Sequence, residues 1–133
     1  MAQVYAVTSG KGGVGKTTIV ANLGTALAKF GKRTLMIDAD IAMPNLAILF
    51  GLKNTPITLY DLLGKKKVDV KQAIYEARGK AHIIPCGASL EGFLKSNLDL
   101  IKKVVEKVRE DYDFIIIDAP SGLSQHSIAP LEA

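Results

Sequence analysis

Short runs of β-branched and other apolar residues alternate along this chain with longer amphipathic stretches. This alternation is typical of βαβ units and predicts an α/β fold, in which a mostly parallel sheet carries helices on both faces. The expected strands are residues 4–8, 34–37, 82–85 and 114–117. The expected helices are two long ones, residues 16–30 and 98–110, and three short ones, residues 46–50, 59–63 and 70–77. The last strand is uniformly apolar, as a strand covered on both faces should be.

The two long helices carry apolar residues at helical spacing. In the first helix these residues form one stripe, which consists of Ile19, Leu23, Ala26, Leu27 and Phe30. In the second helix the corresponding residues are Leu98, Ile101, Val105 and Val108. Gly31 is the expected end of the first helix, because glycine readily adopts the left-handed conformation that terminates many helices.

The composition indicates a chain that folds. Of its 133 residues, 48% are hydrophobic and 23% are charged, and this length fits a single domain, residues 1–133. No apolar run approaches the roughly 18 residues of a membrane-spanning helix, and the N-terminus lacks the features of a signal peptide. The single cysteine, Cys86, agrees with a reducing compartment. We therefore expect a cytoplasmic protein.

The net charge of +4 is mild. It permits anionic ligands and does not demand nucleic acid. The dense basic run from Lys65 to Lys67 is more typical of a solvated turn than of a patch that binds DNA or lipid.

A glycine-rich segment lies between the first expected strand and the first expected helix. Residues 10–18 match the pattern G-x-x-x-x-G-K-[ST] of a phosphate-binding loop. Phosphate oxygens need several converging backbone N–H donors, and residues without a Cβ atom let the chain curl tightly enough to supply them. The glycines that meet this need are Gly10, Gly12, Gly13 and Gly15.

Side chains at the end of this segment add charge and metal-binding capacity. Lys16 is expected to pair with the β- and γ-phosphates, Thr17 to offer its hydroxyl to Mg²⁺, and Thr18 to reach the α-phosphate. Lys11 lies inside the loop, where a second cation could answer charge that develops in a transition state. A solvated lysine is the alternative. With Val14, these residues complete the expected phosphate-binding set.

Carboxylates follow two of the expected strands. Asp38 and Asp40 lie two residues apart, so an extended backbone directs both toward the crevice where open α/β sheets bind ligands. Asp118 ends the last strand and is expected to hold Mg²⁺, together with Asp38 and Thr17. An aspartate at a strand end can instead cap a helix or pair with a lysine. Asn45 can equally be a helix N-cap.

These segments resemble the MinD/ParA family of P-loop ATPases. Residues 11–18, with Lys11, look like the deviant Walker A motif of that family. Residues 38–46 resemble switch I of MinD proteins, and residues 118–122 resemble switch II. Residues 85–92 look most like archaeal MinD proteins, and the resemblance extends from about residue 3 to residue 125.

The resemblance implies an ATPase with ATP or ADP and Mg²⁺ as ligands. Its catalytic residues would be Lys11, Lys16, Asp40 and Asn45. Lys11 would reach the nucleotide of a partner subunit in an ATP-dependent homodimer, and Asp40 and Asn45 would position the attacking water. The dimer would act as a switch in cell division or spatial positioning, with a protein partner.

The resemblance covers only the N-terminal half of the family's three-layer P-loop fold, so the fold is expected to be truncated. The other half carries further strands, adenine contacts and, in bacterial MinD, a membrane-targeting helix. Peripheral membrane association is therefore expected only with that C-terminal region. Two alternatives stay open: a ParA-like DNA-segregation ATPase, which would bind duplex DNA in a salt-sensitive way, and a non-catalytic nucleotide-binding fragment.

Other residues are expected to be structural. Cys86 is predicted to be a small core residue, because no second cysteine is present to share an iron–sulfur cluster. His82 and His126 lack metal-ligand spacing, so a satisfied or solvated role is expected for both.

Overall fold

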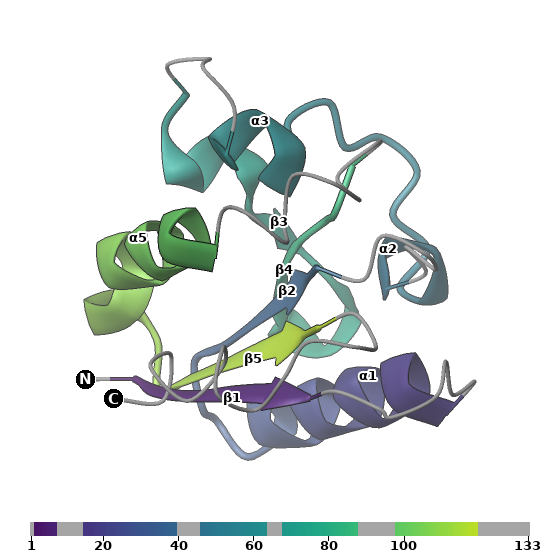
Figure 1. Cartoon of the computed structure of the whole chain (residues 1–133). Coiled ribbons are helices and arrows are strands. Elements are labelled where there is room, and N and C mark those ends of the chain that lie inside the picture. The colour runs from purple at the N-terminus through teal and green to yellow at the C-terminus, as the bar shows by residue number, and fades with distance from the viewer. Residues whose placement is uncertain (1, 8–14, 40–45, 64–67, 88–97, 120–133) are drawn as a thin grey trace.

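A five-stranded sheet organises the computed structural model, which describes residues 2–7, 15–39, 46–63, 68–87 and 98–119 (Figure 1). Its strand order is β1 (Gln3–Val7), β5 (Phe114–Asp118), β2 (Thr34–Asp38), β4 (His82–Ile84) and β3 (Tyr75–Glu76). β1, β5, β2 and β4 are parallel, and β3 pairs antiparallel with β4. The mostly parallel α/β sheet expected from the sequence is thus confirmed.

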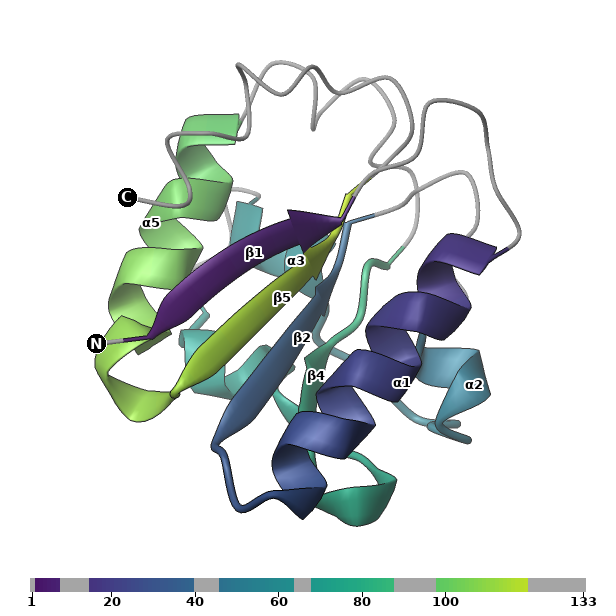
Figure 2. The same ribbon diagram turned by 90° about the horizontal axis from the view of Figure 1, so that it is seen from below.

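Helices cover both faces of the sheet. One layer contains α1 (Gly15–Lys29), α2 (Leu46–Leu49) and the 3₁₀ turn η2 (Arg78–Lys80). The other contains α3 (Leu59–Leu63), the 3₁₀ turn η1 (Val70–Ala73) and α5 (Leu98–Val108), which continues into the 3₁₀ turn η3 (Arg109–Asp111). Figures 1 and 2 show α1 and α5 on opposite sides of the strands.

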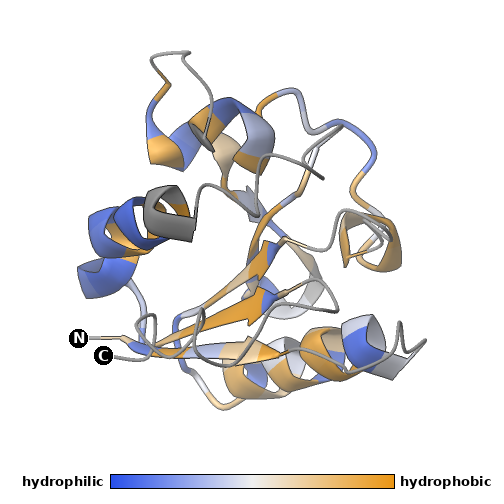
Figure 3. Ribbon diagram, viewed as in Figure 1, coloured by the Kyte–Doolittle hydropathy of each residue, from blue (hydrophilic) through white to orange (hydrophobic). Residues whose placement is uncertain are grey.

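The central strands alternate their side chains between two separate cores. Leu35 and Ile37 of β2 pack with the α5 layer, whereas Met36 packs with the α1 layer. β5 repeats this pattern with Ile115 and Ile117 on one side and Ile116 on the other. Because each face has its own apolar layer, β2 and β5 are hydrophobic throughout their centres, which Figure 3 shows in orange.

The face of α1 that packs on the sheet is not the apolar stripe seen in the sequence. Ile19 is 58%, Leu23 41% and Phe30 82% exposed. The buried face carries small residues instead, and Gly24 leaves no room for a Cβ atom beside the Met36 side chain. The helix lies close to β2 for this reason. Ile19, Leu23 and Phe30 are left exposed, whereas Leu27 of the same stripe packs against the core on this face of the sheet.

The helix expected over residues 70–77 is wrong beyond Ala73. Asp69 caps η1, and Gln72 completes a reciprocal capping box with it. The backbone then becomes extended at Ile74, and β3 pairs with β4. The hydroxyl of Tyr75 also donates to the carbonyl of Ile57 at 2.9 Å, so long-range contacts outweigh local helical spacing here.

The other elements agree with the sequence within a few residues. β1 begins one residue earlier than expected, whereas the expected last residue, Thr8, lies outside the described residues. α5 gives way to η3 at Arg109. Cys86 is 1% exposed, as expected of a core residue. Nδ1 of His82 lies 2.7 Å from the Tyr112 hydroxyl, so this histidine has a hydrogen-bond partner. Lys65 to Lys67 and His126 lie outside the described residues.

Candidate functional site

Two buried aspartates lie side by side where the parallel strands end. Asp38 ends β2 and Asp118 ends β5, and the two residues are paired in the strand register. They are 1% and 0% exposed. Val7, the last residue of β1, is paired with Asp118 on its other side. Figure 2 shows the arrowheads of β1, β5 and β2 together at this edge, which is the position where open α/β sheets bind ligands.

The first turn of α1 brings a cation and a hydroxyl to Asp118. Nζ of Lys16 lies 2.8 Å from Oδ1 of Asp118, and it also donates a hydrogen bond to the carbonyl oxygen of Ala119. The hydroxyl of Thr17 donates to Oδ2 of Asp118 at 3.1 Å. Residues about one hundred positions apart in the chain, flagged by separate motifs, therefore meet in one cluster.

The cluster is charged although it is buried. Lys16 is 6% and Thr17 9% exposed. Oδ1 of Asp118 receives no well-directed hydrogen bond in the described part of the chain, so its contact with Lys16 is an ion pair at close range. Apolar residues of the same volume often stabilise a core as well as a buried ion pair does. Ligand binding therefore explains this ion pair better than a contribution to stability does.

Asp38 has a different set of contacts. Its Oδ2 accepts a long hydrogen bond of 3.4 Å from the backbone N–H of Leu46, at the beginning of α2. The helix-capping alternative is therefore partly realised for this residue. Because the same carboxylate also lies beside Asp118 in the register, a contribution to a metal site stays a prediction.

The donor set at this edge suits Mg²⁺. No group of three or more His, Cys, Asp or Glu side chains is placed to hold a metal within the described ranges. Mg²⁺ is usually bound through one or two carboxylates, with phosphate and water oxygens completing its shell. The Thr17 hydroxyl and the Asp118 and Asp38 carboxylates fit that requirement, and a bound phosphate group would supply the remainder.

The other predicted site residues fall into two groups. Gly15 begins α1, and Thr18 is exposed on its first turn. The rest lie outside the described residues: Gly10, Lys11, Gly12, Gly13, Val14, Asp40 and Asn45. The sequence interpretation missed the carbonyl of Ala119 as a partner of Lys16. No residue type signals such a contact, because every residue carries a backbone carbonyl.

Comparison with known proteins places this geometry in a family. A family model described as an AAA domain matches residues 2–133. An uncharacterized ATP-binding protein of Methanocaldococcus jannaschii is 47% identical over 92% of the chain and 46% of its own length. The septum site-determining protein MinD of Thermotoga maritima is 40% identical over 99% of the chain and 50% of its own length. The chain belongs to the MinD/ParA family of P-loop ATPases.

Solved MinD structures have the same fold as the chain. MinD of Pyrococcus horikoshii, determined in complex with Mg-ADP, superposes with a TM-score of 0.80 at 34% identity, covering 98% of the chain and 54% of that structure. MinD in the MinC:MinD complex of Aquifex aeolicus gives 0.79 at 36% identity, covering 97% and 53%. This member of the MinD/ParA family thus spans about half the length of the relatives that it matches.

Among the described residues of the chain, none of the helices combines the length and the apolar character needed to cross a bilayer.

Proposed function

We propose that residues 1–133 form a P-loop ATPase domain of a MinD-like nucleotide switch, which binds Mg·ATP, dimerises with it and hydrolyses it slowly. The observation that carries the proposal is the buried cluster of Lys16, Thr17 and Asp118 at the carboxyl edge of the sheet. Membership of the MinD/ParA family supports it. So does the Mg-ADP bound in the P. horikoshii relative.

Nucleotide binding follows from where the cluster lies. The N-terminus of α1 offers backbone N–H groups and the positive end of the helix dipole to an anion. Lys16 would exchange its contact with Asp118 for the β- and γ-phosphates, because one ammonium group satisfies either partner. Mg²⁺, held by Thr17 and Asp118 and within reach of Asp38, would neutralise phosphate charge.

Hydrolysis needs little from the protein beyond positioning and charge. In our proposal Asp40 and Asn45 orient a water molecule in line with the γ-phosphate. Lys16 stabilises the developing negative charge from within the subunit, and Lys11 of the partner subunit stabilises it from across the interface. Release of phosphate would then cause the dimer to dissociate and would reset the switch.

The proposal has a direct test in ATP turnover by the purified protein, measured as phosphate release with and without Mg²⁺. We expect slow, Mg²⁺-dependent turnover. The rate per protein molecule should rise with protein concentration, because the proposed active species is a dimer. Tight ATP binding without turnover would favour the non-catalytic alternative, which the half-length match makes worth testing. The MinC:MinD complex of the relative supports a protein partner, and duplex DNA binding would instead favour a ParA-like role.

Asp40→Ala is expected to leave Mg·ATP affinity within about twofold of wild type and to lower kcat by about 100-fold, because the residue acts on the water and not on the ground state. Equilibrium binding and single-turnover hydrolysis measure the two effects separately. A matched loss of affinity would make Asp40 a metal-site residue instead. Asp61→Ala, on α3, serves as the control substitution and should leave both quantities unchanged.

Lys11→Ala is expected to bind ATP as a monomer and fail to dimerise with it, because the partner's phosphate charge is left unanswered at a desolvated interface. Sedimentation velocity with ATP and with ADP, on wild type and variant, provides the measurement. Lys29→Ala removes an exposed lysine at the other end of α1 and should dimerise normally. An ATP-dependent dimer that survives the loss of Lys11 contradicts the proposed role across the interface.

A further inference from the structure

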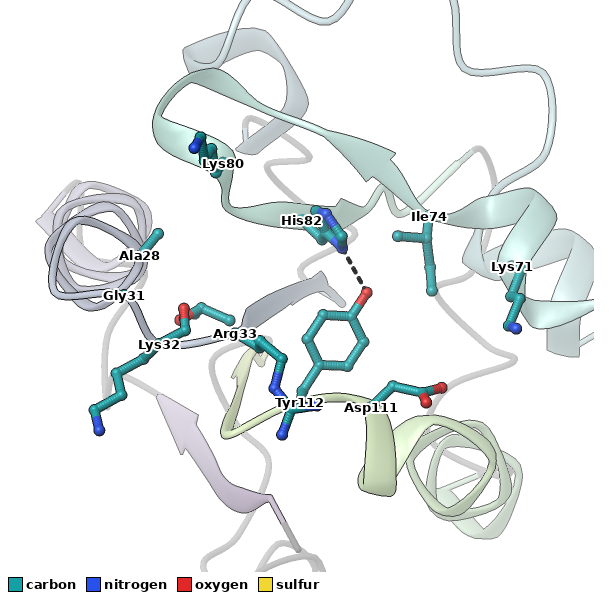
Figure 4. A pocket seen from close by; sticks show the side chains of 11 residues that line it. Ala28, Gly31, Lys32, Arg33, Lys71, Ile74, Lys80, His82, Asp111 and Tyr112 are labelled. Carbon is teal, nitrogen blue, oxygen red and sulfur yellow. Dashed lines mark hydrogen bonds between the residues drawn. The ribbon is translucent and has the colours of Figure 1, made fainter.

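A cavity of about 500 Å³ lies at the end of the sheet opposite the strand-end aspartates. Its walls come from the end of α1, the beginning of β2, η1, η2, β4 and the end of η3 with the residue that follows it (Figure 4). Thr34 lines it at the first residue of β2, whereas Asp38 ends the same strand at the candidate nucleotide site. Its volume falls in the range of about 300–1,000 Å³ that small-molecule sites occupy. The cavity is therefore separate from the nucleotide site and large enough for a ligand.

The centre of the cavity combines apolar surface with a hydrogen-bonding pair. Figure 4 shows Ile74 beside His82 and Tyr112, whose hydroxyl lies 2.7 Å from Nδ1 of His82. Burial, helped by the charge of Asp111, raises the pKa of Tyr112 to about 12, so the hydroxyl keeps its proton at neutral pH. When this hydroxyl donates to Nδ1, neutral His82 carries its proton on Nε2. The pair then offers an N–H donor to a ligand.

Positive charge surrounds this centre. The cavity is lined by Lys32, Arg33, Lys71 and Lys80, with Asp111 as its acidic residue. Arg33 is already engaged, since its guanidinium lies 3.2 Å from the carboxylate of Asp113. Within the described part of the chain, Lys71 and Lys80 have no salt-bridge partner, whereas Lys32 interacts electrostatically with Asp113. An anionic group would supply Lys71 and Lys80 with a partner.

The backbone at Lys80 adds an independent observation. With φ of 69°, Lys80 is the non-glycine residue that adopts a left-handed conformation in the described ranges, directly after Gly79 at 79°. Glycine or asparagine adopts this conformation more easily than lysine. Strained residues cluster at ligand sites. The turn places Lys80 among the residues that line the cavity, two positions before His82, whereas Lys32 is turned outward in Figure 4.

We propose that this cavity binds a small organic phosphate. Its apolar body would lie against Ile74 and the ring of Tyr112. Its phosphate group would be held by Lys80, with His82 as a hydrogen-bond donor, and Lys71 would add positive charge from the opposite side of the cavity. A phosphate dianion matches the site better than a single carboxylate, because basic residues line the cavity on more than one side. The site lies apart from the P-loop and does not depend on the proposed ATPase activity.

The test uses phenyl phosphate as the probe and backbone amide chemical shifts as the readout. Excess Mg·ADP is present, so that residues 15–18 are not the phosphate acceptor. We expect saturable shifts at Lys80, His82 and Tyr112, and weaker binding of both inorganic phosphate, which lacks the apolar body, and benzyl alcohol, which lacks the charge. Shifts confined to residues 15–18, or no saturable shift at the cavity, overturn the proposal.

Two double variants separate specific binding from general charge attraction. Lys71→Gln with Lys80→Gly removes two cavity cations and suits the left-handed backbone at residue 80, and we expect it to raise the Kd for phenyl phosphate by about tenfold. Lys53→Gln with Lys103→Gln removes the same charge from exposed positions outside the cavity and should leave the Kd unchanged. Equal weakening in both double variants contradicts the assignment. The amide spectra without probe report whether each variant is folded.

Discussion

Lys16→Ala is expected to lower the affinity for Mg·ATP by at least about 100-fold, because the β- and γ-phosphates lose a buried cation that forms charge-assisted hydrogen bonds. The structure places this lysine in the first turn of α1, 6% exposed, with its Nζ atom 2.8 Å from Asp118. Isothermal titration with a non-hydrolysable ATP analogue measures the effect. Affinity retained by the variant would contradict the P-loop assignment.

A loss of binding must be separated from a loss of folding. Removing Lys16 leaves Asp118, which is 0% exposed, without its ion-pair partner, and breaking a buried pair in this way costs about 3–5 kcal/mol of unfolding free energy. Lys16→Ala combined with Asp118→Asn removes both charges. We therefore expect it to regain part of that stability while its affinity for Mg·ATP stays at least about 100-fold below that of wild type. Thermal unfolding of the single and double variants distinguishes the two effects.

Asp118→Asn is expected to raise the Mg²⁺ concentration needed for half-maximal turnover by about 10–100-fold, because an amide replaces the carboxylate that would hold the ion. In the absence of Mg²⁺, the substitution should change the affinity for ATP much less than it changes the Mg²⁺ requirement. The reason is that Lys16 no longer has to break an ion pair with a carboxylate before it contacts phosphate. Phosphate release across a Mg²⁺ titration measures the first effect, and nucleotide titration in EDTA measures the second.

A control exists at the other end of the same strand. Asp113 precedes β5, is partly exposed and pairs with Arg33, so Asp113→Asn should leave the Mg²⁺ dependence unchanged. If Asp118→Asn shows wild-type Mg²⁺ dependence as well, the carboxylate of Asp118 is a structural partner of Lys16 and not a metal ligand. The strand-end salt bridge considered for this residue would then be its whole role.

Local information in the sequence was sufficient for the main elements. The strand at Phe114–Asp118 could be predicted because a strand covered on both faces must be apolar along its length. The beginning of α1 could be predicted because glycines, Lys16 and Thr17 follow a strand at the spacing that phosphate binding requires. A shared metal site for Asp38 and Asp118 could be predicted because both aspartates end a strand, and the structure pairs them in the register of β2 and β5.

Contacts between distant residues were decided only by the tertiary structure. The sequence showed the apolar stripe of Ile19, Leu23 and Phe30 but not that α1 would pack through Gly24 against Met36. Likewise, Tyr75 and Glu76 form a strand because β4 is available to pair with them. Helical spacing and glycine-loop chemistry act over a few neighbouring residues, so the chain itself displays them. Three features depend on segments that are tens of residues apart: the packing faces, the contact of Lys16 with Asp118 and the cavity beside Tyr112. Their interactions form only after the sheet has brought those segments together.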